Sequence, residues 1–444
     1  MLKNIKALYI NSLVYYCIAA IVLLFICSFF FAFLYYIVWV LVALFFILFI
    51  ADILLIYGVK NGIIGQRITP EKLSNGDDNY ISIRLENNFP FKISVRIIDE
   101  LPFQFQKRDF LINKSLASKT ADHSTYLVRP TKRGEYHFGH LNIYASGPLK
   151  LISRRYIFDN NQIVATYPSF LQMRKYELMA IHNKLFMQGL KKVRKIGNTR
   201  EFEQIKEYTL GDDIRTINWK ATAKKSQYMV NQYQDEKSQN IYMIIDKGRV
   251  MKSPFNDLTL LDYAINASLV LSNIIIKKYD KAGLFTFSKK ADNRLKPDNK
   301  PVQVQKFMEN LYKVTTDFHE SDFSKLYSEI KQNIHQRSLL ILFTNFETLD
   351  GLNRQLKYLR AITKNHLLVV VFFKNSELDQ IVHSEAKNTQ EIYDKVIAEK
   401  FHYDKKLIVN ELMKYGIYSV LTNPEDLNLN VINKYLEIKA RGIL

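Results

Sequence analysis

The 45 residues from Ala7 to Ala51 contain no Asp, Glu, Lys or Arg, and they decide the architecture of this chain: ALYINSLVYYCIAAIVLLFICSFFFAFLYYIVWVLVALFFILFIA. One helix needs about 20 apolar residues to cross the roughly 30 Å hydrocarbon layer of a membrane. As a single helix this stretch would be about 68 Å long, more than twice that thickness. Two antiparallel helices use the whole length, so the sequence predicts an α-helical transmembrane hairpin.

The hairpin is expected to contain two spans, Tyr9–Phe31 and Ile37–Tyr57, joined by a tight turn at Phe33–Tyr36. Trp39 fits the aromatic belt found where helices leave the membrane. A cleaved signal peptide is excluded, because the apolar stretch is too long and a second span follows directly.

Basic residues flank the hairpin on both sides, with Lys3 and Lys6 before it and Lys60, Arg67 and Lys72 after it. Cytoplasmic segments next to spans carry an excess of Lys and Arg. We therefore expect residues 1–60 to form a multi-pass anchor in the inner (cytoplasmic) membrane of a bacterial cell, with both termini cytoplasmic.

The 444-residue chain carries 62 Lys and Arg against 43 Asp and Glu, a net charge of +19. Such an excess indicates an anionic partner, either nucleic acid or lipid headgroups. The membrane anchor favours lipid, and the basic run Lys191–Lys195 lacks the interleaved aromatic residues of a nucleic-acid site, so no specific nucleic acid is expected. The two cysteines, Cys17 and Cys27, lie in the apolar stretch, so the body has no thiol for a disulfide or a metal site.

Residues 70–169 predict an antiparallel β-sandwich, because short alternating runs recur between turn residues. The predicted strands are Tyr80–Leu85, Phe91–Ile98, Ser124–Val128, Gly134–Phe138, Leu141–Ala145 and Gln162–Tyr167. Residues 170–198 follow as a basic helical connector, which is most simply a solvated linker. Neither this sandwich nor the domain after it needs the hairpin for its core, so the chain beyond residue 60 is expected to fold without it.

From residue 239 onward, buried strands alternate with helices, which predicts a doubly wound α/β domain with a parallel sheet. The strands are expected at Ile241–Ile245, Ala282–Phe287, Leu339–Phe343, Leu367–Phe373 and Ile417–Leu421. The helices are expected at Thr259–Lys278, Val302–Tyr312, Asp322–Gln332, Leu352–Thr363 and Thr389–Tyr415.

Sequence motifs of catalysis are absent from the chain: there is no P-loop, no dinucleotide-binding Gly-x-Gly-x-x-Gly and no Gly-x-Ser-x-Gly. His137 and His140 are three apart on a predicted strand and point to opposite faces, so they cannot share a metal ion. Asp246 ends the first α/β strand, where doubly wound folds bind ligands. It could hold a divalent cation, or it could simply cap the following turn.

Residues 199–221 read TREFEQIKEYTLGDDIRTINWKA. This segment resembles the signature of the bacterial family catalogued as domain of unknown function fifty-eight, with an Arg-Glu-Phe element followed by Gly-Asp-Asp-x-Arg-x-x-x-Trp. The positions proposed for partner docking are Arg200, Glu201, Phe202, Tyr208, Gly211, Asp212, Asp213, Arg215, Trp219 and Lys220.

The resemblance implies a two-span N-terminus, a β-rich domain and, over residues 199–444, the signature plus a domain similar to von Willebrand factor A domains. It also implies a partner, a MoxR-type AAA+ ATPase, in a chaperone-like or envelope-related system. It implies no catalytic residue and no cofactor.

The metal site of such A domains uses Asp-x-Ser-x-Ser and a second acid, whereas this chain has Asp246, Gly248, Val250 and Asn345 at those places. Divalent cations prefer several oxygens, including carboxylates. We therefore expect a degenerate site without a metal.

The signature can also be interpreted from its residue types alone. Gly211–Asp213 has the composition of a turn. Trp219 is expected to anchor the segment against one of the domains, and Arg215 to pair with nearby glutamates. The segment is then either a clasp between domains or a docking surface.

The function predicted is a membrane-anchored, cytoplasmic-facing adaptor rather than an enzyme. The alternative is a cation-dependent hydrolase or nuclease that uses Asp246. The sequence identifies no small-molecule ligand.

Overall fold

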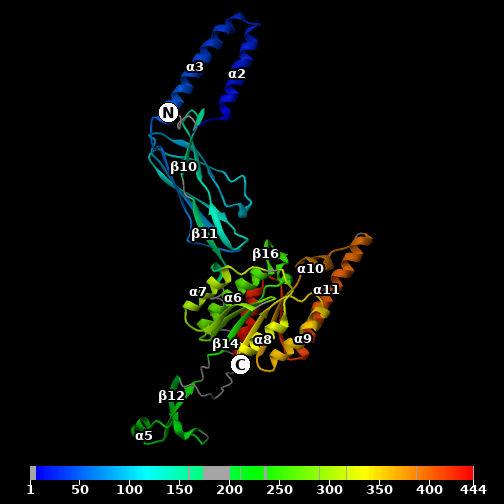
Figure 1. The fold of residues 1–444 in the computed structure, drawn as a ribbon. Coiled ribbons are helices and arrows are strands. Elements are labelled where there is room, and N and C mark those ends of the chain that lie inside the picture. Colours follow the sequence, from blue (N-terminus) through cyan, green and yellow to red (C-terminus); the bar gives the residue numbers. More distant parts are fainter. Residues whose placement is uncertain are drawn as a thin grey trace. The chain divides into compact units, whose positions relative to one another are not determined.

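The computed structural model describes residues 7–158, 161–173, 201–210, 212–234, 238–289, 291–316, 318–386 and 388–443. The chain divides into two compact units, Met1–Tyr167 and Pro168–Leu444 (Figure 1). Arg200, Gly211 and most of the expected connector lie outside the described residues.

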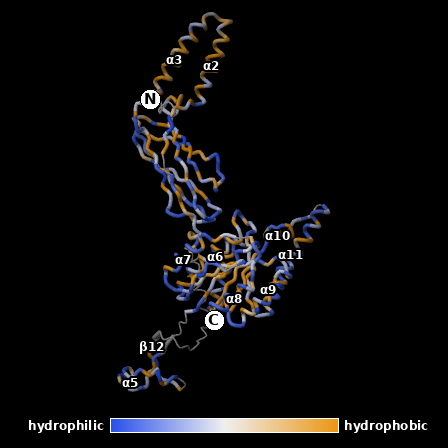
Figure 2. Tube along the Cα trace, in the orientation of Figure 1, coloured by the Kyte–Doolittle hydropathy of each residue, from blue (hydrophilic) through white to orange (hydrophobic). Residues whose placement is uncertain are grey.

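Two apolar helices, α2 (Ser12–Ser28) and α3 (Ala32–Tyr57), form a hairpin in the first unit (Figure 1). Their contact includes an edge-to-face pair between Phe25 and Trp39, with ring centroids 6.0 Å apart. Figure 2 shows hydrophobic residues along both helices. By length and composition, Phe33–Tyr57 could cross a membrane, whereas α2 is apolar but shorter.

The turn of the hairpin lies at Phe29–Phe31, and the expected position at Phe33–Tyr36 is wrong because those residues belong to α3. Phe31 adopts the extended conformation that precedes a helix, with φ −130° and ψ 95°. An unbroken apolar run carries no turn residue that would have fixed this position.

Tyr9 was expected in the first span, but it belongs to a strand, β1 (Leu8–Ile10), which pairs antiparallel with β10 (Ile152–Phe158). Asn11 explains why the helix starts late. Its side-chain nitrogen donates to Lys150 O at 2.9 Å, and its oxygen accepts from the Ser153 hydroxyl at 2.6 Å. A polar side chain that is satisfied by the neighbouring strand holds the backbone there in extended form.

The rest of the first unit is built from packed sheets with the strand orders β1-β10-β9-β5-β6, β2-β4-β7 and β3-β11-β8. The strands are β2 (Ile63–Ile68), β3 (Lys72–Ser74), β4 (Asn79–Asn87), β5 (Ile93–Asp99), β6 (Ile112–Leu116), β7 (Ala121–Val128), β8 (Gly134–Phe138), β9 (Leu141–Ser146) and β11 (Gln162–Tyr167). Strand β4 alternates buried and outward residues along its length, as the period-two pattern predicts. Inward side chains from all three sheets share one core, and all six predicted strands are present.

The second unit contains a six-stranded sheet with the order β18-β17-β14-β19-β20-β21, parallel except for the edge strand β18. Its strands are β14 (Asn240–Asp246), β17 (Lys281–Phe287), β18 (Ala291–Asp298), β19 (Leu339–Phe343), β20 (Leu367–Phe373) and β21 (Tyr418–Thr422). The helices are α6 (Leu260–Lys277), α7 (Val302–Tyr312), α8 (Phe323–Asn333), α9 (Leu349–Thr363), α10 (Ser376–His383), α11 (Thr389–Lys414) and α12 (Leu427–Arg441).

Helices cover both faces of this sheet, with α6, α7 and α12 in one hydrophobic core and α8, α9 and α11 in the other. The predicted strands and helices are confirmed, and β18, α10 and α12 are additional. The strand order reverses between β14 and β19, which flank each other at the centre of the sheet. In open α/β sheets, ligands bind outside the carboxyl ends of the strands at such a point.

The signature forms a small antiparallel hairpin of β12 (Glu201–Glu207) and β13 (Met229–Gln234). Between the strands lie a 3-10 turn at Ile214–Thr216 and the short helix α5 (Trp219–Lys225).

Candidate functional site at the carboxyl edge of the sheet

Asp246 ends β14 and is fully buried, at 0% exposure. One carboxylate oxygen accepts from the backbone N–H of Gly248 at 2.8 Å and from the hydroxyl of Ser321. The other accepts from the hydroxyl of Thr344 at 2.7 Å. These three hydrogen bonds therefore offset much of the unfavourable free energy of burying the carboxylate.

The positions that would complete a cation site do not fit one. A Cβ at Gly248 would lie 2.0 Å from Ser321 Oγ, so a side chain there would displace the hydroxyl that donates to Asp246. Val250 packs against the apolar core. Within the described residues, no group of three His, Cys, Asp or Glu side chains could hold a metal ion.

Asn345, which follows β19, accepts a hydrogen bond from a lysine side chain of the same chain. Its Oδ1 accepts a hydrogen bond from Lys405 Nζ, on α11, at 2.9 Å. The same ammonium donates to Phe346 O at 2.6 Å and lies 5.7 Å from the centre of the Phe372 ring. Burial lowers the pKa of Lys405 to about 8, against the opposing charge of Glu347.

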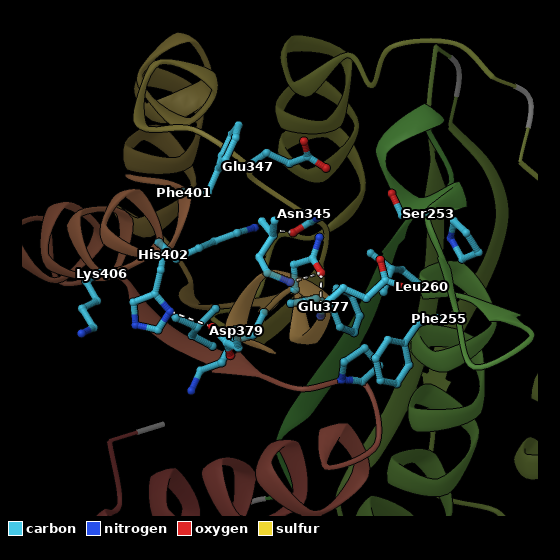
Figure 3. A pocket seen from close by; sticks show the side chains of 18 residues that line it. Ser253, Phe255, Leu260, Asn345, Glu347, Glu377, Asp379, Phe401, His402 and Lys406 are labelled. Carbon is cyan, nitrogen blue, oxygen red and sulfur yellow. Dashed lines mark hydrogen bonds and ion pairs between the residues drawn. The ribbon is translucent and has the colours of Figure 1, made fainter. Parts of the chain in front are cut away.

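A pocket of about 410 Å³ opens beside Lys405, over the carboxyl ends of β19, β20 and β21 (Figure 3). Its wall combines apolar side chains with charged ones of both signs. On one side, His402 Nδ1 and Asp379 Oδ1 are 2.8 Å apart. Its lining includes Phe255, Leu260, Asn345, Glu347, Phe373, Lys374, Glu377, Asp379, His402, Lys405, Lys406 and Leu421.

The sequence predicted a ligand site at the ends of β14 and β19, whereas the pocket lies over the ends of β19, β20 and β21. Asp246 and Asn345 do lie at neighbouring strand ends, as expected from the parallel sheet. Thr344 directly precedes Asn345 and was the one further residue that strand position could have identified. Nothing in the local sequence marks Ser321 or Lys405, because their depth depends on how a loop and a long helix pack.

The polar residues of the signature stabilise its own loop. Asp212 accepts from the backbone N–H and the hydroxyl of Thr209, at 3.0 and 2.9 Å, and from Lys206 Nζ at 2.8 Å. These bonds, led by that from Lys206, lower the pKa of Asp212 to about 2. Asp213 accepts from the backbone N–H of Arg215 at 3.0 Å. Lys206 therefore supplies a cation to this loop, and the expected pairing of Arg215 with Glu201 and Glu203 involves side chains outside the described ones.

Asn218 caps α5 by accepting from the backbone N–H of Ala221 at 3.1 Å, and its own backbone N–H donates to Met229 O at 2.8 Å. Tyr208 is fixed through its backbone, which donates to Tyr228 O at 2.8 Å. Glu201 and Phe202 contribute to the signature through strand pairing in β12.

Apolar side chains of the signature face outward. Leu210 is fully exposed, and Ile214 and Trp219 are 69% and 68% exposed. Trp219 is the first residue of α5, and its ring is not covered by the small hairpin itself, so its expected contact with one of the domains stays a prediction. Arg215 and Lys220 are also exposed.

Residues 204–386 match the family described as Protein of unknown function DUF58. The chain is similar to the uncharacterized protein YeaD of Bacillus subtilis, with 24% identity over 245 residues, which cover 54% of this chain and 59% of the relative. The chain thus spans less than two thirds of that relative's length.

Two solved structures are also similar. The conserved hypothetical protein BatB from Bacteroides thetaiotaomicron has 12% identity and a TM-score of 0.31, covering 45% of this chain and 98% of that one. The ASH/PapD-like domain of human CEP192 has 14% identity and a TM-score of 0.18, covering 24% and 87%. TM-scores this low establish no shared fold.

The match falls on the second unit, where it takes in most of the signature hairpin and the sheet as far as β20. The family model that matches residues 204–386 is therefore the one that the signature residues indicated, and the match is to this part of the chain.

Proposed function

We propose that this protein is a membrane-anchored adaptor. The hairpin α2–α3 crosses the inner membrane twice with both termini cytoplasmic, and the α/β domain, similar to von Willebrand factor A domains, works with a MoxR-type AAA+ ATPase. The observation that carries the proposal is the apolar, outward-facing surface of α2 and α3.

Most large apolar side chains of these two helices are exposed, including Leu23, Ile26, Phe46, Ile47 and Leu54. Exposed apolar surface of this extent is unfavourable in water and favourable in lipid. The interfacial aromatic residues and the basic flanks give the hairpin its orientation.

The outward apolar residues of the signature support a docking role. Asp212, Asp213 and Asn218 accept hydrogen bonds within their own loop. The exposed side chains of Leu210, Ile214 and Trp219 can contact a partner. Exposed aromatic and aliphatic anchors of this kind carry much of the binding energy in protein interfaces. No observation favours the alternative cation-dependent hydrolase or nuclease, since the surroundings of Asp246 do not fit a cation.

The docking proposal is tested by capture of the full chain from detergent-solubilised membranes, with and without ATP. An AAA+ ATPase should co-purify with the wild type, and Ile214→Ala and Trp219→Ala should reduce its yield strongly. Phe103→Ala removes an even more exposed aromatic residue from the first unit and is the matched control. Equal ATPase recovery with all variants would contradict the docking surface.

The orientation is tested separately by fusing alkaline phosphatase, which is active only outside the cytoplasm, to Leu444. We expect no activity, whereas a fusion within the Phe29–Phe31 turn should be active. A strongly active fusion at Leu444 would refute the topology.

A further inference from the structure

Lys405 presents a partly buried positive charge that lacks a bonded carboxylate. An ammonium has three N–H donors. Two are used by the neutral oxygens of Asn345 and Phe346. None of the ion pairs among the described residues includes Lys405, and Glu347 acts on it only through space. Withdrawing a cation from water is costly unless an anion compensates it.

The pocket beside Lys405 has the size and shape of a small-molecule site. Its volume of about 410 Å³ falls within the roughly 300–1,000 Å³ typical of ligand pockets. In Figure 3, Phe255 and Leu260 line one side, and His402 and Lys406 line the other.

A tight hairpin positions the apolar side of this pocket. Pro254 pairs with Thr259 and Phe255 with Leu258, leaving Asn256 and Asp257 as a two-residue turn with φ of 45° and 66°. Positive φ at both central residues is the geometry of the preferred two-residue hairpin turn. The Asn256 side chain donates to Glu425 Oε1 at 2.6 Å, which ties the turn to the loop after β21. The apolar wall is therefore held in place before any ligand arrives.

We propose that this pocket binds a small monocarboxylate with an apolar body. Its carboxylate accepts a hydrogen bond from Lys405 Nζ, and its body packs against Phe255, Phe373 and Leu421. This binding site is independent of the docking surface on the signature.

The charges around Lys405 favour one negative charge over two. Lys374, Lys406 and His402 also line the pocket, but so do Glu347, Glu377 and Asp379. These three carboxylates would repel a phosphate dianion more strongly than a monocarboxylate. The single negative charge of a monocarboxylate is enough to compensate Lys405. The apolar side of the wall selects for a hydrocarbon body.

The test is isothermal titration of the full-length protein in detergent with 3-phenylpropionate, using 3-phenylpropionamide as the neutral analogue of equal shape. We expect the carboxylate to bind at least about tenfold more tightly than the amide. Lys405→Met should abolish this preference. Lys406→Met removes an exposed lysine that lines the same pocket and should change the affinity less than about threefold.

A pH series on the wild type provides a second readout that needs no substitution. Because burial holds the pKa of Lys405 at about 8, the carboxylate preference should disappear as the pH rises from about 7 to about 9.5. The other titratable groups facing the pocket are Glu347, Glu377, Asp379, His402, Lys374 and Lys406, and any pH dependence that they cause persists in Lys405→Met.

Four results would overturn the proposal: equal binding of acid and amide, no binding of the acid at concentrations on the order of 10 mM, equal losses in Lys405→Met and Lys406→Met, or tighter binding of inorganic phosphate than of 3-phenylpropionate.

Discussion

The carboxylate of Asp52, on the apolar helix α3, accepts a hydrogen bond from the backbone N–H of Ile152, at the start of β10, at 3.1 Å. The same oxygen accepts from the backbone N–H of Leu151 at 3.0 Å. Gly147 makes this approach possible, because a Cβ there would lie 2.7 Å from Asp52 Oδ1. Since β1 pairs with β10 as well, both ends of the helical hairpin are fastened to one strand.

Asp52→Leu should destabilise the first unit by about 2 to 4 kcal/mol, because two buried N–H groups lose their acceptor. Asp52→Asn keeps an acceptor oxygen and should cost clearly less. Thermal unfolding in detergent measures both variants. Equal effects of Leu and Asn would show that the hydrogen bonds do not determine the loss.

Deleting residues 1–60 should leave the six-stranded sheet of the second unit intact but weaken the packed sheets of the first unit, contrary to the expectation from sequence. Leu151 and Ile152 are buried against Val14 and Ile56 of the hairpin, and each exposed side chain forfeits about 1.5 to 3 kcal/mol. The deletion also exposes the edge of β10. Hydrogen exchange should show faster exchange of the β10 amides, with β14 and β19 unchanged as internal controls. Full protection of β10 in the fragment would contradict this prediction.

Asp246→Ala should destabilise the second unit by about 2 to 5 kcal/mol, because Gly248, Ser321 and Thr344 lose a buried acceptor. This is more than the loss of a turn cap that the sequence suggested. Asp246→Asn should cost less, and Glu385→Ala, at an exposed position, should cost little. Denaturant unfolding compares the three variants.

Magnesium or manganese at about 1 mM should leave the melting temperature of the wild type almost unchanged, because the surroundings of Asp246 do not fit a cation. A cation present at a hundred times its Kd would instead stabilise the folded protein by about 2.7 kcal/mol. A large shift that disappears in Asp246→Ala would restore the cation site.

The stability of the wild type relative to Lys405→Met should increase with pH. The unfolded chain keeps its proton up to about pH 10.5, whereas the folded protein releases it near pH 8, so the unfolded state binds more protons between these values. The destabilisation by the buried charge is complete below pH 8 and fades towards pH 10.5, by about 2 to 4 kcal/mol in total. Unfolding at pH 7 and pH 10 tests this, with Lys406→Met as the control that should show no such trend.

Periodicity and apolar runs predicted most of the fold. Residues such as Leu339–Phe343 and Gly134–Phe138 form strands with the predicted bounds, because burial on one or both faces leaves a direct trace in the sequence. The edge strand β18 and the three-residue strand β1 were missed. Edges and short strands are defined by their partners, and Leu8–Ile10 looks like the apolar residues that follow it.

The candidate site was predictable only as a location. The position of Asp246 and Asn345 follows from strand ends, but the hydrogen-bond donor to Asn345 is a lysine 60 residues away in the sequence. Long-range pairings of this kind come from the packing of α11 against the sheet, which leaves no local pattern. The sequence also leaves the role of Trp219 open, since a large aromatic residue is equally suited to a core or to an interface.

The contact between Lys405 and Asn345 also determines which conditions of growth can alter the charge at this edge of the sheet. An ammonium that belongs to the chain cannot be removed by a chelator or by dialysis, and it does not depend on the supply of metal in the growth medium. The charge at this edge of the sheet responds to acidity instead, and only in mildly alkaline conditions, because its pKa is about 8. Metal starvation should therefore leave this part of the protein as it is, whereas alkaline stress would neutralise it.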